Sequence, residues 1–124
     1  MLFLTASCQQ DAVVCTAEWV TFEVYVKDSL ENPVILDDYY TQNEATGELI
    51  RFREIYGYND SLLKTQGCYL LITDGQGKWA KNGFFEIIFK GFIDSVEVIS
   101  EKYIVVADVC HINLLKGNTK IIVE

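Results

Sequence analysis

The sequence is short of proline, histidine and basic residues, and each shortage excludes a class of protein. One residue in 124 is proline and one is histidine, which excludes a proline-rich linker and leaves few nitrogen ligands for a zinc site. Lysine and arginine number 10 against 18 aspartates and glutamates, so the formal net charge is −8. An acidic surface repels phosphate groups, and we therefore expect no binding to nucleic acid or directly to an anionic membrane.

Long apolar runs are missing as well. No stretch of the sequence reaches the ~18 consecutive apolar residues of a membrane-spanning helix. Half of the residues are nevertheless hydrophobic and 13% are aromatic, which is too much apolar material for a disordered chain. At this length the sequence predicts one folded domain with a sizeable core.

The dominant hydrophobic period is two, which is typical of strands with one face on a core. Between residues 19 and 27, Val20, Phe22, Val24 and Val26 share one face, and mainly polar residues share the other. About seven or eight such strands with regular turn signals predict an all-β antiparallel sandwich. The alternative fold is a lipocalin-like calyx barrel, which unequal strand lengths and the lack of a legible plug disfavour. The other expected strands are residues 34–36 with 39–41, 49–55, 68–73, 84–90, 95–99, 103–114 and 119–123.

Two turns organise the second half of the sequence. Residues 75–83 contain three glycines and one tryptophan, and we interpret them as a hairpin loop. Residues 116–118 read Lys-Gly-Asn, which predicts a tight turn after which the last strand pairs back on the preceding one.

The N-terminus carries a pattern that is similar to the lipobox of bacterial lipoproteins. Apolar residues Leu2 to Leu4 are followed by Thr-Ala-Ser, then Cys8, then a polar run. The apolar region is shorter than the usual ~7–15 residues, so we expect the true signal to begin upstream of Met1. The pattern predicts that Cys8 is lipidated, with residues 1–14 as a signal remnant and tether and residues 15–124 as the domain. The alternative is a frayed terminus with an incidental cysteine.

Four cysteines are present, and none forms a C-x-x-C pair: Cys8, Cys15, Cys68 and Cys110. If Cys8 carries lipid, the other three allow one bridge and one free thiol. Cys15 precedes the first strand and Cys110 falls within a late one, and first and last strands can be neighbours in a sandwich. We therefore favour a Cys15–Cys110 disulfide, with Cys68 buried and free. The alternative is that all are buried, reduced thiols.

Three features together resemble a known family: the opening strand, the Asp-x-x-x-Asn-Pro-Val turn from Asp28 to Val34, and the strand from Tyr103 to His111. They are similar to the immunoglobulin-like, transthyretin-like sandwich domains of small Bacteroidetes-type lipoproteins. An early cysteine and a late Cys-His dipeptide recur there, matching Cys15 and Cys110-His111. The resemblance implies an outer-membrane-anchored envelope protein and implies no particular chemistry.

Acidic residues offer no clear catalytic or metal site. Asp37 and Asp38 are adjacent, so on a strand they point to opposite faces and cannot form a general acid–base pair. Asp28, Glu31 and Asp37 could converge on a hard cation, but the spacing of a calcium loop is absent. We favour a solvated acidic surface and expect no metal and no cofactor.

The nucleophiles of the sequence also lack the partners that catalysis requires. His111 and Cys110 are adjacent and diverge on a strand, and a disulfide would consume the thiol. Ser61 and Ser95 have no G-x-S-x-G elbow. Gly75-Gln76-Gly77 lacks the lysine and the following helix of a phosphate loop. We expect no enzymatic activity.

Aromatic residues in irregular segments are the best candidates for binding. Trp79 lies in the glycine-containing loop, and Tyr56 and Tyr58 flank Gly57. Exposed rings present apolar faces to sugars or to a partner protein. The alternative is that Trp79 closes one end of the sandwich.

The sequence therefore predicts a non-catalytic, envelope-associated sandwich module that binds a protein or ligand. One alternative is a glycan-binding module that uses the loop aromatics. Another is a ligand-sequestering or hydrolytic protein, which would need an enclosed pocket with converging polar groups.

Overall fold

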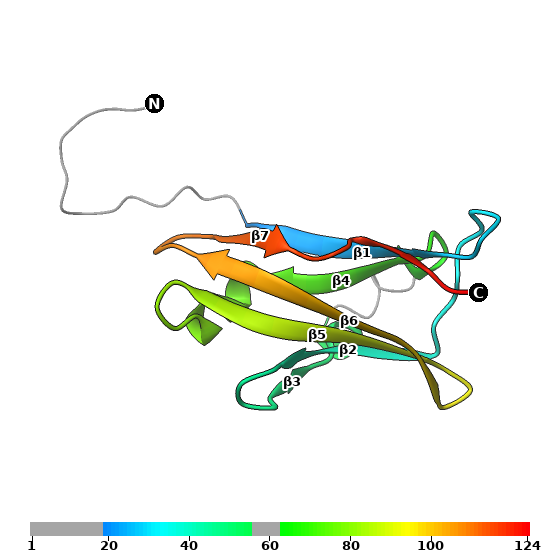
Figure 1. Ribbon diagram of the computed structural model, residues 1–124, viewed down its shortest axis with the longest axis horizontal. Coiled ribbons are helices and arrows are strands. Elements are labelled where there is room, and N and C mark those ends of the chain that lie inside the picture. The colour runs from blue at the N-terminus through cyan, green and yellow to red at the C-terminus, as the bar shows by residue number, and fades with distance from the viewer. Residues whose placement is uncertain (1–18, 56–62) are drawn as a thin grey trace, which may run out of the picture.

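The computed structural model describes residues 19–55 and 63–124, which form mostly strands in two layers (Figure 1). The first sheet has the order β4-β1-β8, and the second has the order β3-β2-β5-β6-β7. The described chain is thus an all-β sandwich, as predicted. The strands are β1 (Thr21–Lys27), β2 (Asp38–Asn43), β3 (Leu49–Ile50), β4 (Cys68–Thr73), β5 (Phe84–Ile93), β6 (Val96–Ala107), β7 (Ile112–Lys116) and β8 (Lys120–Ile122).

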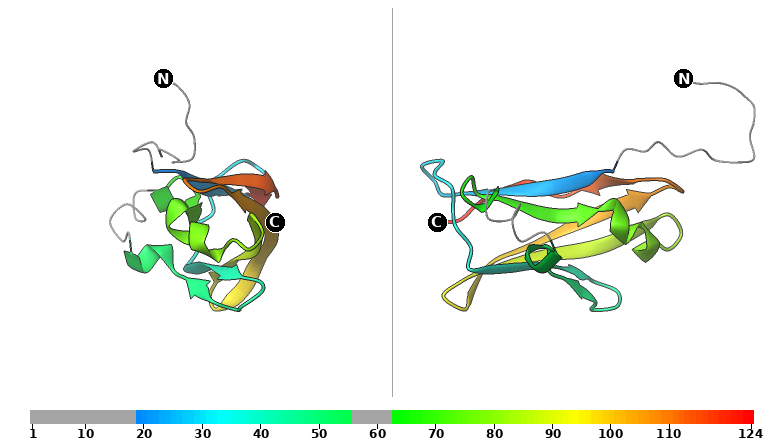
Figure 2. Two further views of the ribbon diagram at one scale, coloured as in Figure 1. Left: turned by 90° about the vertical axis from the view of Figure 1, so that its left-hand side faces the viewer. Right: turned by 180° about the vertical axis from the view of Figure 1, so that it is seen from behind.

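Alternating burial places the core between the two sheets, whose layers Figure 2 shows from the end and from behind. On β1, Val24 and Val26 are fully buried. On β5, Phe85, Ile87 and Phe89 are buried while the residues between them are exposed or half-buried. This is the period-two pattern of a strand with one face on a core.

The two sheets are joined on one side by a hydrogen bond between strands. Phe22 pairs with Ile72 and Glu23 pairs with Leu70, which leaves Leu71 as an extra residue in β4. The carbonyl of Leu71 accepts a hydrogen bond of 2.6 Å from the hydroxyl of the fully buried Thr41 on β2. A bulge of this kind redirects a backbone group out of its ladder, and here the group reaches the opposite sheet.

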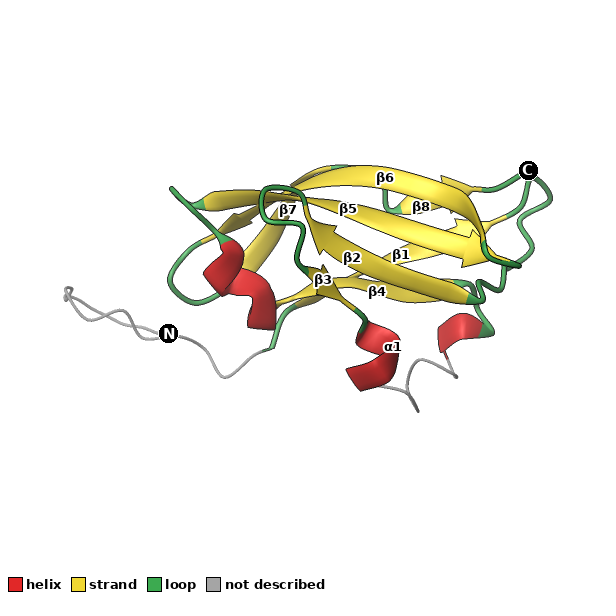
Figure 3. Cartoon of the chain, turned by 90° about the horizontal axis from the view of Figure 1, so that it is seen from below, coloured by secondary structure: helices red, strands yellow, loops and turns green. Residues whose placement is uncertain are grey.

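The predicted strand over residues 49–55 is wrong beyond Ile50. The chain turns instead into the short helix α1 (Phe52–Ile55), which follows β3 in Figure 3. Phe52 enters the core with 1% of its surface exposed, and the Arg51 guanidinium turns back to the Asp38 carboxylate at 2.8 Å. These two anchors end the strand.

The loop predicted over residues 75–83 is in part a 3-10 helix, η1 (Asp74–Trp79). Thr73 and Gln76 form a capping box at its start, which supplies the hydrogen bonds that an unpaired helix end lacks. Only Lys81 to Phe84 forms a hairpin turn, in which Asn82 and Gly83 have positive φ angles of 57° and 88°.

The predicted single strand over residues 103–114 is broken. The Asp108 carboxylate accepts hydrogen bonds of 2.7 Å from the amides of Cys110 and His111, which closes a turn between β6 and β7. Cys110 therefore lies in this turn and not within a strand.

The prediction that the last strand pairs back on its predecessor is also wrong. β8 joins the other sheet and runs parallel to β1, with Val26 opposite Ile121. The Tyr103 hydroxyl donates to the Asn118 carbonyl at 2.6 Å, and Ile121 is 6% exposed. This bond and the burial of Ile121 carry the chain across to the first sheet. In the described residues, no helix has the length and apolar character needed to cross a membrane.

Candidate functional site

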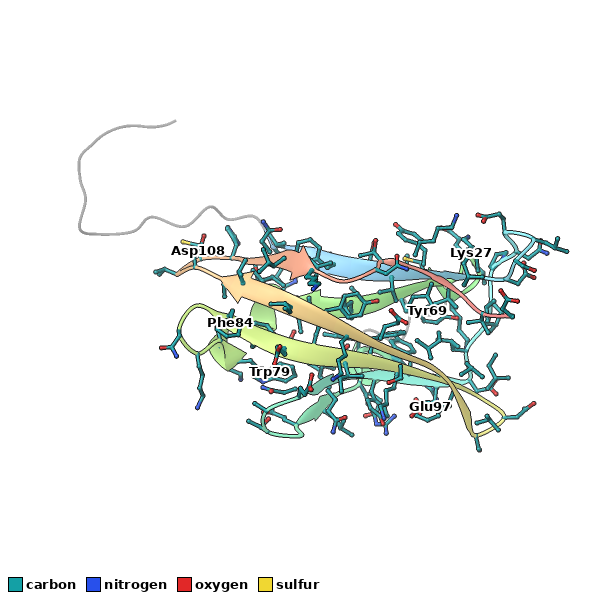
Figure 4. All side chains as sticks on the ribbon, viewed as in Figure 1. Lys27, Tyr69, Trp79, Phe84, Glu97 and Asp108 are labelled. Carbon is teal, nitrogen blue, oxygen red and sulfur yellow. The ribbon has the colours of Figure 1, made fainter. Side chains whose placement is uncertain are left out.

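One end of the sandwich carries Trp79 and the turn with Cys110 and His111, which the sequence singled out. Trp79, Phe84 and Asp108 lie at this end, and Lys27 and Glu97 lie at the other (Figure 4). η1 and the β6–β7 turn meet here, so residues that are far apart in the sequence become neighbours.

Asp74, the first residue of η1, binds three segments through a side chain that is 7% exposed. Its carboxylate accepts hydrogen bonds of 2.9 Å from the amides of Val20 and Ile112, and one oxygen lies 2.7 Å from His111 Nδ1. Burial by itself raises the pKa of Asp74, but the Val20 amide, the His111 ring and the Ile112 amide outweigh it and hold the pKa below its usual range. Asp74 thus clamps the start of β1, η1 and the start of β7 together.

The Asp74–His111 contact has the form in which a carboxylate orients a general base. Here, however, the same carboxylate is also occupied by two backbone amides from separate segments. A shallow hollow of about 420 Å³ lies beside it, with Asp108, His111 and Asn113 in its lining. The hydrogen bonds from the His111 and Cys110 amides lower the pKa of Asp108. The carboxylates of Asp74 and Asp108 therefore both accept hydrogen bonds from backbone amides.

A second hollow of about 280 Å³, which we call the Phe84 hollow, lies between the β2–β3 turn and the start of β5. Phe84 is 47% exposed, so part of its ring faces solvent at this cavity. Trp79 and Phe85 are buried beside it, with ring centroids 5.9 Å apart in an edge-on arrangement. The lining residues are Asn43, Glu44, Ala45, Thr46, Trp79, Lys81, Asn82, Phe84, Phe85 and Glu86.

The walls of the Phe84 hollow are held by hydrogen bonds. The buried Asn43 side chain accepts from the Ala45 amide at 3.0 Å, and the Glu44 amide donates to the Glu86 carbonyl at 3.0 Å. The second of these bonds joins the β2–β3 turn directly to β5. The cavity is therefore formed by rigid elements, as binding sites for ligands commonly are.

A third hollow of about 370 Å³, the Glu101 hollow, shares Glu44 and Glu86 with the Phe84 hollow. Its other charged lining residues are Glu101, Lys102 and Lys116, and Lys102 Nζ lies 3.2 Å from a Glu44 carboxylate oxygen. The two hollows are therefore adjacent along the outer side of β5 and β6, with carboxylates at their common wall.

Trp79 is not the exposed loop aromatic that a binding platform requires. It is 9% exposed and packs against Phe85, which is the alternative in which it closes one end of the sandwich. Phe84 and Trp19 are the exposed rings of the described chain at this end, and Trp19 lies over Gly75 with 58% of its surface exposed. Alternation gave a signal for Phe84, because it shares its face with Glu86 and opposes the buried Phe85.

The acidic residues considered for a cation do not converge. Asp28 accepts from the amides of its own loop, Leu30 and Asn32. Glu31 pairs with Lys120 at 2.8 Å, and Asp37 accepts from the Asp94 amide at 2.6 Å. In residues 19–55 and 63–124, no group of three histidine, cysteine or acidic side chains could hold a metal ion.

The cysteines fall into two groups. Cys68 is free and 3% exposed, as the sequence predicted, and burial followed by the charge of Glu23 raises the pKa of its thiol to about 11. Cys8 and Cys15 lie outside the described residues, so the lipidation of Cys8 and the Cys15–Cys110 pairing stay predictions.

Three further candidates also lie outside the described part of the chain. They are Tyr56, Tyr58 and Ser61. Their proposed roles stay untested.

No protein-family model, curated protein or solved structure matches this chain. The function must therefore be argued from the geometry of the hollows and from the N-terminal sequence pattern.

Proposed function

We propose that this chain is a non-catalytic binding module of the cell envelope, anchored to the outer membrane through a lipid on Cys8. The observation that carries the proposal is the Phe84 hollow, where a half-exposed phenylalanine lies in a cavity with hydrogen-bonded walls. A large apolar ring kept partly in water costs free energy, and contact with a partner recovers it.

The state of the interior supports a binding role over a catalytic one. The space between the sheets is filled by large side chains such as Tyr69, Tyr103 and Phe89. The hollows described above open to solvent. A hydrolytic or ligand-sequestering protein would instead enclose its substrate among converging polar groups.

For the finer fold class we propose an immunoglobulin-like, transthyretin-like sandwich whose strand order differs from that of the constant-type immunoglobulin domain. In the immunoglobulin constant-type sandwich the first two strands share a sheet. Here β1 lies in the first sheet and β2 in the second, and β1 pairs with β8 in parallel.

The Cys15–Cys110 disulfide is geometrically reachable. Asp74 binds both Val20 and Ile112, so the start of β1 lies beside the turn that contains Cys110. Cys15 lies five positions before Val20 in the sequence, and an extended segment of that length spans at most ~17 Å.

Mass spectrometry tests the envelope anchor. The chain is expressed with its natural upstream region, and the N-terminal peptide from the membrane fraction is compared with that of Cys8→Ser. We expect an acylated N-terminal Cys8 in the wild type and release of Cys8→Ser from the membrane. An unmodified thiol at Cys8 would end the lipoprotein proposal.

Site-specific cross-linking tests the binding surface. A photoreactive phenylalanine derivative replaces Phe84 in one variant and Val96 in the control. Val96 is also exposed, but it is the first residue of β6, whereas Phe84 pairs with Val106 near the end of that strand. We expect one identifiable adduct from position 84, suppressed by excess wild-type chain, and none from position 96. Equal labelling at the two positions, or none at either, would overturn the assignment.

Recognition of a glycan is a second candidate, because the exposed Phe84 ring lies beside the Asn82 amide and the Glu86 carboxylate. Apolar ring faces with nearby polar groups suit a sugar. A glycan array probed with the wild type and Phe84→Ala tests it. Binding that Phe84→Ala abolishes would support this candidate, and a silent array would remove it.

A further inference from the structure

The hairpin turn between η1 and β5 contains the one Asn-Gly pair of the sequence, at Asn82 and Gly83. Both residues are exposed, and their φ angles of 57° and 88° are those of the two central positions of a type I′ turn. Asparagine and glycine are favoured in such a turn because both positions need a positive φ. The turn therefore places a side-chain carboxamide directly before a glycine amide, in contact with solvent.

The Gly83 amide is open to attack on its neighbour. Within the described residues, no hydrogen bond engages the Gly83 nitrogen or the Asn82 side chain. A Cβ placed on Gly83 would meet nothing within 4 Å, so no other segment crowds this residue. Two hydrogen bonds between Lys81 and Phe84, of 3.0 and 3.3 Å, close the turn, and local opening at an exposed turn costs far less than global unfolding.

The other described asparagines lack this arrangement. Asn32 precedes a proline, which has no amide hydrogen. The side-chain oxygens of Asn43, Asn113 and Asn118 each accept a hydrogen bond from a nearby backbone amide. Asn82 therefore stands apart both in its glycine neighbour and in its free side chain.

We propose that Asn82 deamidates spontaneously in the folded protein, through attack of the Gly83 nitrogen on the side-chain Cγ. The Gly83 nitrogen loses its proton to solvent and bonds to Cγ, and the side-chain nitrogen leaves as ammonia, which closes a five-membered succinimide. The intramolecular placement of the two groups makes this attack faster than direct hydrolysis. Water then opens the ring at either carbonyl to give aspartate or isoaspartate, so one water is consumed and one ammonia is released.

The product changes the Phe84 hollow and the start of β5. A carboxylate at position 82 adds negative charge to a lining that already contains Glu44 and Glu86. Isoaspartate also inserts an extra carbon into the main chain, which displaces Gly83 from the Ala107 amide that now donates to its carbonyl at 2.9 Å. The reaction gives this hairpin a limited chemical lifetime, and it does not depend on the proposed binding role.

Peptide mapping of aged protein tests the proposal. The full chain is incubated at pH 8 for several weeks and digested with trypsin, which releases residues 82–90. This peptide is compared with synthetic versions that carry asparagine, aspartate or isoaspartate, and an unincubated sample corrects for changes during digestion. We expect both products to accumulate at position 82 at least about tenfold faster than deamidation at Asn113 or Asn118, a difference of about 1.4 kcal/mol in barrier height.

A matched variant ties the change in charge to this residue. Asn82→Gln keeps the carboxamide, but its reaction would need a less favourable six-membered ring. Isoelectric focusing should show an acidic species that grows with time in the wild type and is lost in Asn82→Gln. The same species in the variant would place the modification elsewhere and overturn the proposal.

Two further outcomes would also overturn it. One is an unchanged Asn82 in the folded chain under conditions in which a synthetic peptide of residues 79–90 deamidates, because the hairpin would then protect the pair. The other is aspartate without isoaspartate, because opening of a succinimide yields both.

Discussion

Several buried polar side chains of this protein act as links between distant segments. Asp74 joins β1, η1 and β7, and Thr41 joins the two sheets through the Leu71 carbonyl. A buried amide that loses such a partner keeps its desolvation cost without compensation. We therefore expect the most sensitive polar positions to be these links and not the exposed ion pairs.

Replacing Asp74 by alanine should lower the free energy of unfolding by about 3 kcal/mol, because two amides and the His111 ring lose their acceptor. Asp74→Asn should cost less, since one carbonyl oxygen remains. Urea denaturation measures both. Glu48→Ala, on the exposed β2–β3 turn, is the control and should change stability by less than about 0.5 kcal/mol. Equal stability of Asp74→Ala and the control would contradict the clamp.

Acid should destabilise the protein below about pH 4. Backbone hydrogen bonds lower the pKa of Asp28 and Asp108, and the Asp74 pKa is lowered by its amide and His111 contacts. The unfolded chain then binds protons more readily than the folded one, so the contribution is complete above the ordinary aspartate pKa and is lost as pH falls through the folded values. Urea midpoints from pH 7 to pH 3 should fall, and less steeply in Asp74→Asn. A flat profile would show that these bonds do not act through ionisation.

Cys68 should resist alkylation in the folded protein. Its thiol is 3% exposed and has a pKa of about 11, so at pH 8 only about one thiol in a thousand is ionised. Peptide mapping after iodoacetamide treatment should find Cys68 unmodified in native protein and modified in urea. Labelling within minutes under native conditions would show that the site opens.

At the scale of elements, the turns determine where each strand ends and with which strand the next one pairs. Asp108 closes the β6–β7 turn, and Tyr103 holds the chain after β7 at Asn118. Gly117 allows the contact between Tyr103 and Asn118, because its φ is 134° and its backbone lies against the Tyr103 ring. The crossing of the chain to the first sheet therefore depends on a glycine at this position.

Gly117→Ala should destabilise the protein more than Gly83→Ala. Both glycines have positive φ, but a Cβ at position 117 would lie 2.1 Å from Tyr103 Cδ2, whereas a Cβ at Gly83 meets nothing within 4 Å. The backbone cost of about 1–2 kcal/mol applies to both, and the clash adds to it only at 117. Thermal unfolding compares the two. Equal losses would mean that the Tyr103 ring can move aside.

At the scale of the molecule, the sandwich is joined by contacts between residues that lie far apart in sequence. β1 is first among the described strands, yet it pairs with β4 on one side and with the last strand, β8, on the other. A bridge from the segment before β1 to the β6–β7 turn would add a covalent link between the same parts of the chain.

The proposed Cys15–Cys110 disulfide should stabilise the folded chain by about 4 kcal/mol, since it closes a long loop. Thiol counting under denaturing, non-reducing conditions should find one free thiol, Cys68, besides Cys8. Cys15→Ser and Cys110→Ser should lower the melting temperature equally, and the double variant no further. Three free thiols besides Cys8 in protein from an oxidising compartment would refute the bridge.

The sequence by itself determined the class of the fold. Alternation in β1 and β5 follows from the geometry of a strand, in which successive side chains point to opposite faces, so the faces that enter the core could be read directly. The same alternation placed Phe84 with Glu86 on the outer face. It therefore carried a signal for the exposed ring that the prediction based on Trp79 overlooked.

Only the tertiary structure decided how the strands are connected and where the candidate site lies. Pairing of β8 with β1 depends on contacts of Tyr103 and Ile121, and the end of β3 depends on where Phe52 and Arg51 find their partners. The burial of Trp79 likewise depends on Phe85, in the strand that follows the turn. Local sequence sets the period of a segment, but partners distant along the chain set its neighbours, because their contacts exist only once the two sheets have packed.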